Sequence, residues 1–210
     1  SANATDLGWL FFQNAYASYC HTVPSLLMAL TSANQYNKTN DFEAPSIIDV
    51  FKVAGFKTYW LSEQGVSWTD NPLNALASES DKFSFVRPVG RIPALLDETL
   101  ASIDPKQNNL IVVHLIGSHA PYAARIPTKY QPDFLQQKHD LAYLNKGRPS
   151  FVTDELNPYD ASIHYTDWTL SEIARVLQGR ISETNAFIYV SDHGEDVLGG
   201  KAHMASLFTY

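Results

Sequence analysis

Two short and nearly continuous apolar runs, at residues 110–116 and 186–190, constrain the fold of this chain most strongly. Their sequences, Leu-Ile-Val-Val-His-Leu-Ile and Ala-Phe-Ile-Tyr-Val, lack the alternation of a strand that has one face in water. Such runs are typical of strands in a parallel sheet with helices on both faces. We therefore expect an α/β fold in which both segments are buried strands and 110–116 is a central one.

Segments with other patterns separate these strands. Apolar spacing predicts helices at residues 23–30, 46–54, 92–103 and 160–177, and an aromatic-rich strand at 56–61. Thr22 and Ser46 are the expected N-caps of the first two helices. The stretch 121–158 is polar and rich in Pro, Lys and Gln, which indicates an excursion with local helix. The order predicts one domain over residues 1–210, an α/β/α sandwich around a mostly parallel sheet.

Composition excludes some classes of function. The formal net charge is −7, and no basic face is evident, so nucleic acid is not an expected partner. No stretch reaches the roughly 20 apolar residues of a transmembrane helix. The one cysteine, Cys20, cannot form a disulfide within the chain.

Polar motifs follow both apolar runs, where ligands bind in parallel sheets. Asp192-His193-Gly194-Glu195 follows the second run, and Gly117-Ser118-His119 follows the first. An adjacent carboxylate and imidazole on a turn are suitable zinc ligands. The alternative is a helix-capping Asp with a chance His neighbour. His119 and His203, which lies ten residues beyond His193, favour the metal site.

Thr22 is the candidate nucleophile. A hydroxyl at a helix N-terminus lies at the positive end of the helix dipole, which favours an alkoxide and an attached phosphoryl group. Coordination to zinc would lower the pKa of the hydroxyl further. The alternative is that Thr22 merely caps the helix.

Other candidate residues have a structural explanation of equal or greater weight. His114 lies inside the first apolar run and fits a core histidine as well as a functional one. Trp60, Trp68, Tyr122 and Tyr130 are of the types that line a lipid or acceptor site, but we expect them to pack in the core.

Five motifs occur in a recognisable order along nearly the whole chain. They are Asn14-Ala15-Tyr16-Ala17-Ser18 leading to Thr22-Val23-Pro24-Ser25-Leu26; Ser46-Ile47-Ile48-Asp49-Val50 with Ala54-Gly55-Phe56-Lys57-Thr58-Tyr59-Trp60-Leu61-Ser62; His114-Leu115-Ile116-Gly117-Ser118-His119-Ala120-Pro121-Tyr122; Tyr159-Asp160-Ala161-Ser162-Ile163-His164-Tyr165-Thr166-Asp167; and Tyr189-Val190-Ser191-Asp192-His193-Gly194-Glu195. Together they resemble the sulfatase-like branch of the alkaline phosphatase superfamily, and within it the phosphoethanolamine transferases that act on lipid A or the lipopolysaccharide core.

The resemblance implies a role for each candidate residue. Thr22 would be the zinc-bound nucleophile that takes phosphoethanolamine from phosphatidylethanolamine and passes it to a sugar phosphate or hydroxyl. Asp192 and His193 would bind zinc. His119 and His203 would bind a second zinc ion or hold the phosphoryl oxygens, so one or two ions are expected. The resemblance also implies a monomer whose catalytic domain lies in the periplasm, with membrane helices in the inner membrane.

The chain departs from the family pattern in several places. The family has a further acidic zinc ligand, in a Gly-Glu motif on its first strand, and the chain begins after that point. The family's membrane helices and last strands are also missing, and the lone Cys20 differs from the disulfides of many members. We therefore expect a fragment, truncated at both ends, which is itself inactive if its metal site is incomplete.

Three other functions are alternatives to this assignment. A sulfatase needs Cys or Ser followed by x-Pro-x-Arg, whereas Pro24 comes two positions too late after Cys20 and no Arg follows. A phosphoglycerol transferase uses a similar threonine and metal. A non-catalytic envelope module would be favoured if the acidic ligand were absent from the native sequence.

Overall fold

Strand β1 (Lys57–Ser62) is the centre of a parallel three-stranded sheet with the order β2-β1-β3. In this computed structural model, β1 pairs with β2 (Lys82–Phe85) and with β3 (Asn109–His114), and the second register runs from Lys57 opposite Asn109 to Ser62 opposite His114. The structure describes residues 9–34, 36, 43–65, 72–104, 106–135, 150–180, 185–197 and 201–204, with the backbone alone for 150–155, 180 and 201–204. The predicted α/β class and parallel sheet are confirmed.

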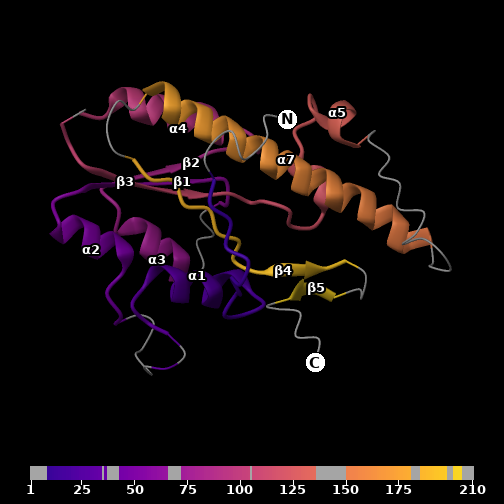
Figure 1. Ribbon diagram of the computed structural model, residues 1–210, viewed down its shortest axis with the longest axis horizontal. Coiled ribbons are helices and arrows are strands. Elements are labelled where there is room, and N and C mark those ends of the chain that lie inside the picture. The colour runs from indigo at the N-terminus through magenta and orange to yellow at the C-terminus, as the bar shows by residue number, and fades with distance from the viewer. Residues whose placement is uncertain are drawn as a thin grey trace.

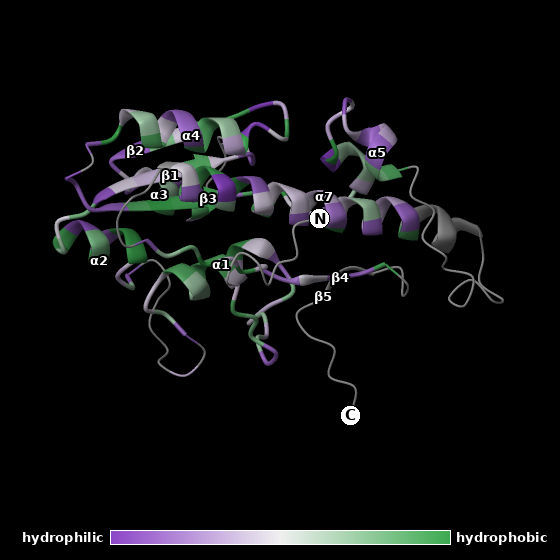
Figure 2. Cartoon of the chain, turned by 45° about the horizontal axis from the view of Figure 1, so that its top comes forward, coloured by the Kyte–Doolittle hydropathy of each residue, from purple (hydrophilic) through white to green (hydrophobic). Residues whose placement is uncertain are grey.

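Helices cover both faces of this sheet (Figure 1). One layer contains α1 (Thr22–Leu30), α2 (Ile47–Val53) and α3 (Pro72–Ser78), and the other contains α4 (Ile92–Ser102) and α7 (Ser150–Arg180). Figure 2 shows that α7 carries hydrophilic and hydrophobic residues in alternation. The predicted sandwich of helices around a sheet is therefore confirmed.

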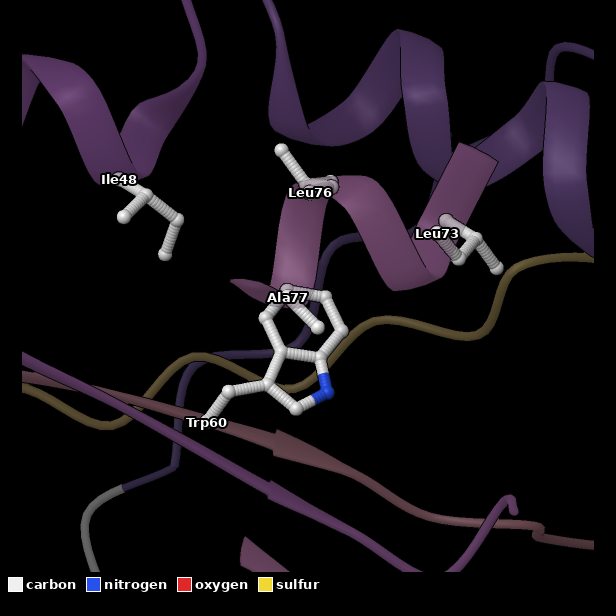
Figure 3. Packing of buried hydrophobic residues seen from close by; sticks show 5 residues of the cluster. All are labelled: Ile48, Trp60, Leu73, Leu76 and Ala77. Atoms are coloured by element: carbon white, nitrogen blue, oxygen red, sulfur yellow. The ribbon is translucent and has the colours of Figure 1, made fainter. Parts of the chain in front are cut away.

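Successive residues of β1 build the two halves of the core, because side chains alternate between the faces of a strand. Trp60 packs against Ile48, Leu73, Leu76 and Ala77 of the first helical layer (Figure 3). Leu61 packs on the opposite face against Ile92, Leu96 and Ile173 of α4 and α7. The two helical layers are thus held to the sheet by neighbouring side chains of one strand.

The predicted helix ends are accurate where local chemistry defines them. Ser46 caps α2, with its hydroxyl accepting a hydrogen bond from the amide of Asp49 at 3.0 Å, and Gly55 follows the helix with a φ of 85°. The expected cap at Thr22 is wrong, because His21 holds the N-cap position and Thr22 is the first residue of α1. The hydroxyl of Thr22 is therefore available for another contact.

The expectation that both apolar runs are buried strands is wrong. β3 is partly buried along its length, because it lies at the edge of the described sheet while β1 takes the centre. Residues 185–190 form neither a helix nor a strand with the described residues. Ile188 is 82% exposed and Val190 is 59% exposed, although Phe187 packs against the core on the α4 side. A continuous apolar run therefore did not identify which strand is central.

The segment between β3 and the last strands also differs from expectation. Helix α7 begins at Ser150, ten residues before the predicted start at residue 160, and it contains Pro158. Before it lie a short 3₁₀ helix, η2 (Tyr122–Arg125), and α5 (Gln131–Leu135). The chain then forms an antiparallel hairpin of β4 (Gly194–Asp196) and β5 (Lys201–Met204).

The aromatic residues occupy the core as expected. Trp60 is 1% exposed, Tyr122 is buried, and Tyr130 lies against Trp168. Trp68 lies outside the described residues. Among the helices that the structure describes, none has the length and apolar character needed to cross a membrane.

Candidate metal and nucleophile site

Thr22 meets His193 across 171 residues of sequence. The hydroxyl oxygen Oγ1 of Thr22 lies 3.3 Å from Nε2 of His193. Helix α1 positions Thr22, because Val23, Leu26 and Leu30 of this helix pack against the core around Trp60. The predicted alternative, in which Thr22 is a simple helix cap, does not describe this contact.

Asp192 approaches the same imidazole nitrogen. Its carboxylate oxygen Oδ2 lies 3.4 Å from Nε2 of His193, and its Oδ1 accepts a hydrogen bond from the backbone amide of His193 at 3.0 Å. The side chain of His193 is 5% exposed and that of Asp192 is 27% exposed. A carboxylate, a hydroxyl and an imidazole nitrogen therefore converge at one partly sheltered point, and we call Thr22, Asp192 and His193 the donor trio.

A hydrogen bond on the other side of the ring defines the tautomer of His193. Its Nδ1 lies 2.9 Å from the carbonyl oxygen of Gly194. Because a carbonyl oxygen can only accept, Nδ1 carries the proton, and in the neutral ring Nε2 presents a lone pair. Metal-binding histidines are typically oriented by such a bond from the second nitrogen. The ring is thus oriented as a ligand towards Thr22 and Asp192.

The spacing of the donor trio fits zinc. Zinc holds N and O ligands at roughly 2.0–2.1 Å in tetrahedral geometry, which separates two ligand atoms by about 3.3–3.4 Å. The distances from His193 Nε2 to Thr22 Oγ1 and to Asp192 Oδ2 are 3.3 and 3.4 Å. Among the described residues, no group of three or more His, Cys, Asp and Glu side chains is placed to hold an ion. The trio therefore has the spacing expected of part of a zinc site, with a hydroxyl as its third donor.

His119 lies on the loop that follows β3. Its Nδ1 donates to the carbonyl oxygen of Ala120 at 2.7 Å, which leaves Nε2 as the acceptor in the neutral ring. The ring is exposed. The charge of Asp192 acts on His114 at the end of β3, so the donor trio and this loop lie at the same edge of the sheet. The contacts above join Thr22, Asp192 and His193, and the role of His119 stays a prediction.

The backbone of His203 belongs to β5, but its side chain lies outside the described part of the structure. Its neighbour Met204 pairs with Gly194, which directly follows His193. The hairpin therefore brings the backbone of His203 beside the strand that continues from the donor trio. Its role as a ligand also stays a prediction.

His114 behaves as a core histidine at the border of the site. Its ring packs edge-on against Trp60, and its Nδ1 lies 3.4 Å from the hydroxyl of Ser62. Burial lowers the pKa of His114, and the negative charge of Asp192 acts in the opposite direction. The neutral ring is therefore favoured.

Two residues that the sequence interpretation missed support the loop of His119. Arg125 donates from Nε to the carbonyl oxygen of His119 and from a terminal nitrogen to that of Ala120, both at 2.7 Å. Buried Glu63 accepts from the amides of Gly90 at 2.7 Å and Ile116 at 3.4 Å, while burial raises its pKa. Neither residue stands in a recognisable ligand motif, so the loop conformation was needed to find them.

The chain is similar to several known proteins. The family model named Sulfatase matches residues 4–207. The phosphoethanolamine transferase EptC of Escherichia coli K12 is 28% identical over 210 residues, which cover 95% of this chain and 35% of that protein. A putative phosphoethanolamine transferase of Haemophilus influenzae is 31% identical over 189 residues, covering 83% of this chain and 36% of that protein. The chain thus spans about a third of the length of these relatives.

A solved structure supports the same assignment. The zinc complex of the C-terminal periplasmic domain of E. coli EptC matches with a TM-score of 0.78 and 27% identity, over 93% of this chain and 56% of that one. The predicted resemblance to phosphoethanolamine transferases and the alkaline-phosphatase-like fold are therefore confirmed. That this neighbour binds zinc agrees with the spacing of the donor trio.

Proposed function

The chain belongs to the sulfatase family, and we propose that it forms the nucleophile and zinc-binding part of a phosphoethanolamine transferase. The proposal depends above all on the contact between Thr22 and His193, because it joins a hydroxyl at a helix N-terminus to an oriented imidazole. The names of the relatives support the group transferred.

In the proposed first half-reaction, Oγ1 of Thr22 attacks the phosphorus of phosphatidylethanolamine. The bond between phosphorus and the diacylglycerol oxygen breaks, and the proton of Thr22 ends on that oxygen. Phosphoethanolamine is then esterified to Thr22. In the second half-reaction, a hydroxyl or phosphate of lipid A, the lipopolysaccharide core or another envelope glycan attacks the phosphorus. The bond between phosphorus and Oγ1 of Thr22 breaks, and the proton of the attacking group ends on Thr22.

Some residues of this chain would position the reacting groups, and others would stabilise the charge of the phosphoryl group. Asp192 and His193 would hold zinc beside Thr22, and the N-terminus of α1 would favour negative charge on the attached phosphoryl group. When bound, zinc would lower the pKa of the threonine hydroxyl and stabilise charge on the phosphoryl oxygens. His119 and His203 would hold phosphoryl oxygens or a second ion.

The location follows from the same relatives. The matched E. coli structure is a C-terminal periplasmic domain, and we infer that this chain works in the periplasm, in a protein attached to the inner membrane. There it would meet both a phospholipid donor and a glycan acceptor.

A sulfatase is the second candidate, because the family model carries that name. Its chemistry requires a formylglycine, and the stretch from Cys20 to Pro24 lacks the x-Pro-x-Arg pattern that directs this modification. The contact of the Thr22 hydroxyl with His193 supports the transferase instead. A phosphoglycerol transferase would use the same donor trio, so the donor head group needs a direct test.

That test uses the full-length gene product, loaded with zinc and incubated with phosphatidylethanolamine. Intact mass and peptide fragmentation should reveal one phosphoethanolamine group on Thr22. Thr22→Ala should form no adduct and lose turnover while its circular dichroism spectrum stays unchanged. Turnover retained by Thr22→Ala would refute the mechanism, and an adduct from phosphatidylglycerol alone would reassign the donor.

A further inference from the structure

A glutamate lies two residues beyond His193, in contact with a buried tyrosine. The hydroxyl of Tyr122 donates to Oε2 of Glu195 at 3.4 Å. Tyr122 is 6% exposed and comes from η2, on the loop after β3. Its ring packs against that of Tyr159 on α7, with centroids 5.1 Å apart and planes at 72°. We call Tyr122, Tyr159 and Glu195 the tyrosine–glutamate cluster.

This cluster combines negative charge with aromatic rings. Burial raises the pKa of Tyr159, and the nearby charges of Glu195 and Asp160 raise it further. Three separate elements, the η2 loop, α7 and β4, therefore bring carboxylates and phenol rings together beside the proposed zinc site.

The position of Glu195 within β4 is irregular. The pairing register between β4 and β5 shifts between Gly194 and Asp196, so Glu195 stands at a bulge. Bulges occur often beside active sites, where they redirect a side chain. Glu195 follows His193 by two residues, so its backbone lies within about 7 Å of that of His193. The tyrosine–glutamate cluster is therefore a neighbour of the donor trio.

A carboxylate in this place is unfavourable for a phosphate alone. Its charge would repel the phosphoryl oxygens that the site must accept. A substrate that also carries a cation reverses this effect, because an ammonium donates charge-assisted hydrogen bonds to a carboxylate and is attracted to aromatic faces. Phosphoethanolamine carries such an ammonium, whereas a phosphoglycerol head group is neutral at the same position.

From these contacts we propose that Glu195, held by Tyr122 and flanked by Tyr159, binds the primary ammonium of the transferred head group and so selects phosphoethanolamine over phosphoglycerol. This inference rests on the proposed function, and it assigns the selection of the donor to a residue outside the donor trio.

The experiment compares two donors and two variants. Zinc-loaded wild-type, Glu195→Gln and Asp133→Asn proteins, all full-length gene products, are incubated with vesicles of phosphatidylethanolamine or of phosphatidylglycerol. The rate of head-group addition to Thr22 is measured by intact mass. Asp133 is an exposed residue of α5, so Asp133→Asn removes one negative charge away from the site. Binding of O-phosphoethanolamine and of glycerol 3-phosphate is measured in parallel by calorimetry.

Glu195→Gln should lower the preference for the ethanolamine donor by roughly 10- to 100-fold, the loss expected for one charged hydrogen bond. In both assays, the rate or affinity should decrease for the ethanolamine compound and not for the glycerol compound. Asp133→Asn should keep the wild-type preference. If Glu195→Gln fails to fold, Tyr122→Phe replaces it. That variant keeps the ring packing and removes the hydroxyl that holds Glu195, so it should lower the preference by a smaller factor.

The outcomes separate the inference from the proposed function. If the wild type forms the adduct and a folded variant keeps the wild-type preference, the inference is overturned and the function stands. An equal loss with both donors also overturns it, because Glu195 would then serve the chemistry common to both. If the wild type forms no adduct from phosphatidylethanolamine, the proposed function fails and the inference fails with it.

Discussion

Replacement of Arg125 by alanine should loosen the loop that carries His119. The guanidinium of Arg125 donates to two consecutive carbonyl oxygens, those of His119 and Ala120, each at 2.7 Å. Partial burial lowers the pKa of Arg125, but a guanidinium stays charged at any pH of interest. Both bonds are thus charge-assisted and partly shielded from water.

The size of the effect follows from these two bonds. Hydrogen bonds to charged groups contribute about 1.5–3 kcal/mol each, and the partial exposure of Arg125 favours the lower value. Arg125→Ala should therefore lower the free energy of unfolding by about 3 kcal/mol. Arg125→Lys keeps the charge but lacks the planar fork, so it should retain one of the two bonds and lose about 1.5 kcal/mol.

Urea denaturation followed by circular dichroism measures these differences. Arg91→Ala is the matched control, because the Arg91 side chain is 53% exposed and its pair with Glu98 spans 3.8 Å. Such a surface pair contributes about 0–1 kcal/mol. If Arg125→Ala destabilises the protein no more than Arg91→Ala does, Arg125 does not support the loop as we argue.

Two further predictions concern the metal site and the sheet. His193→Ala should weaken zinc binding by more than the roughly 10- to 100-fold loss typical of outer-shell partners, as measured by metal analysis at fixed free zinc, and an unchanged zinc content would remove His193 from the ligands. The backbone amide of Thr58, followed by the side chains of Lys57 and Thr58, lowers the pKa of Asp81. Asp81 therefore adds stability above its unfolded pKa of about 3.9, and this stability is lost as the pH falls through the lower folded value. Asp81→Asn should flatten the loss of stability between neutral and acidic pH. The prediction is contradicted if the free energy of unfolding of this variant, taken from denaturation curves, falls with pH as steeply as that of the wild type.

Local chemistry made much of the fold predictable, whereas strand order depends on distant pairing. Ser46 and Gly55 mark the ends of α2, because a side-chain cap and a positive φ act within a few residues. The position of β1 at the centre could not be deduced in this way, since its aromatic composition is less uniformly apolar than that of residues 110–116. The run 186–190 shows the same limit, because apolar composition does not determine what a strand pairs with.

The sequence indicated the residue types of the candidate site, but not the contacts that hold those residues in place. Asp192 and His193 are adjacent, so their motif is visible in the sequence, and the helix N-terminus, together with the resemblance to known transferases, indicated Thr22. The structure added the orientation of the ring of His193 by Gly194. Tyr122 reaches Glu195 from a loop 73 residues earlier, and no periodicity within either segment indicates that contact.

The donor trio also joins parts of the fold that pack on opposite faces of the sheet. Thr22 belongs to α1, which packs on the side of Trp60, whereas Phe187 anchors the segment before Asp192 on the side of Leu61. Residues 188–190 between Phe187 and the trio are exposed. An ion held by Thr22, Asp192 and His193 would bridge the two attachments in the folded state alone, since Thr22 and His193 are 171 residues apart along the chain. The proposed zinc would therefore stabilise the fold in proportion to its affinity, so that metal binding and folding are linked at this edge of the sheet.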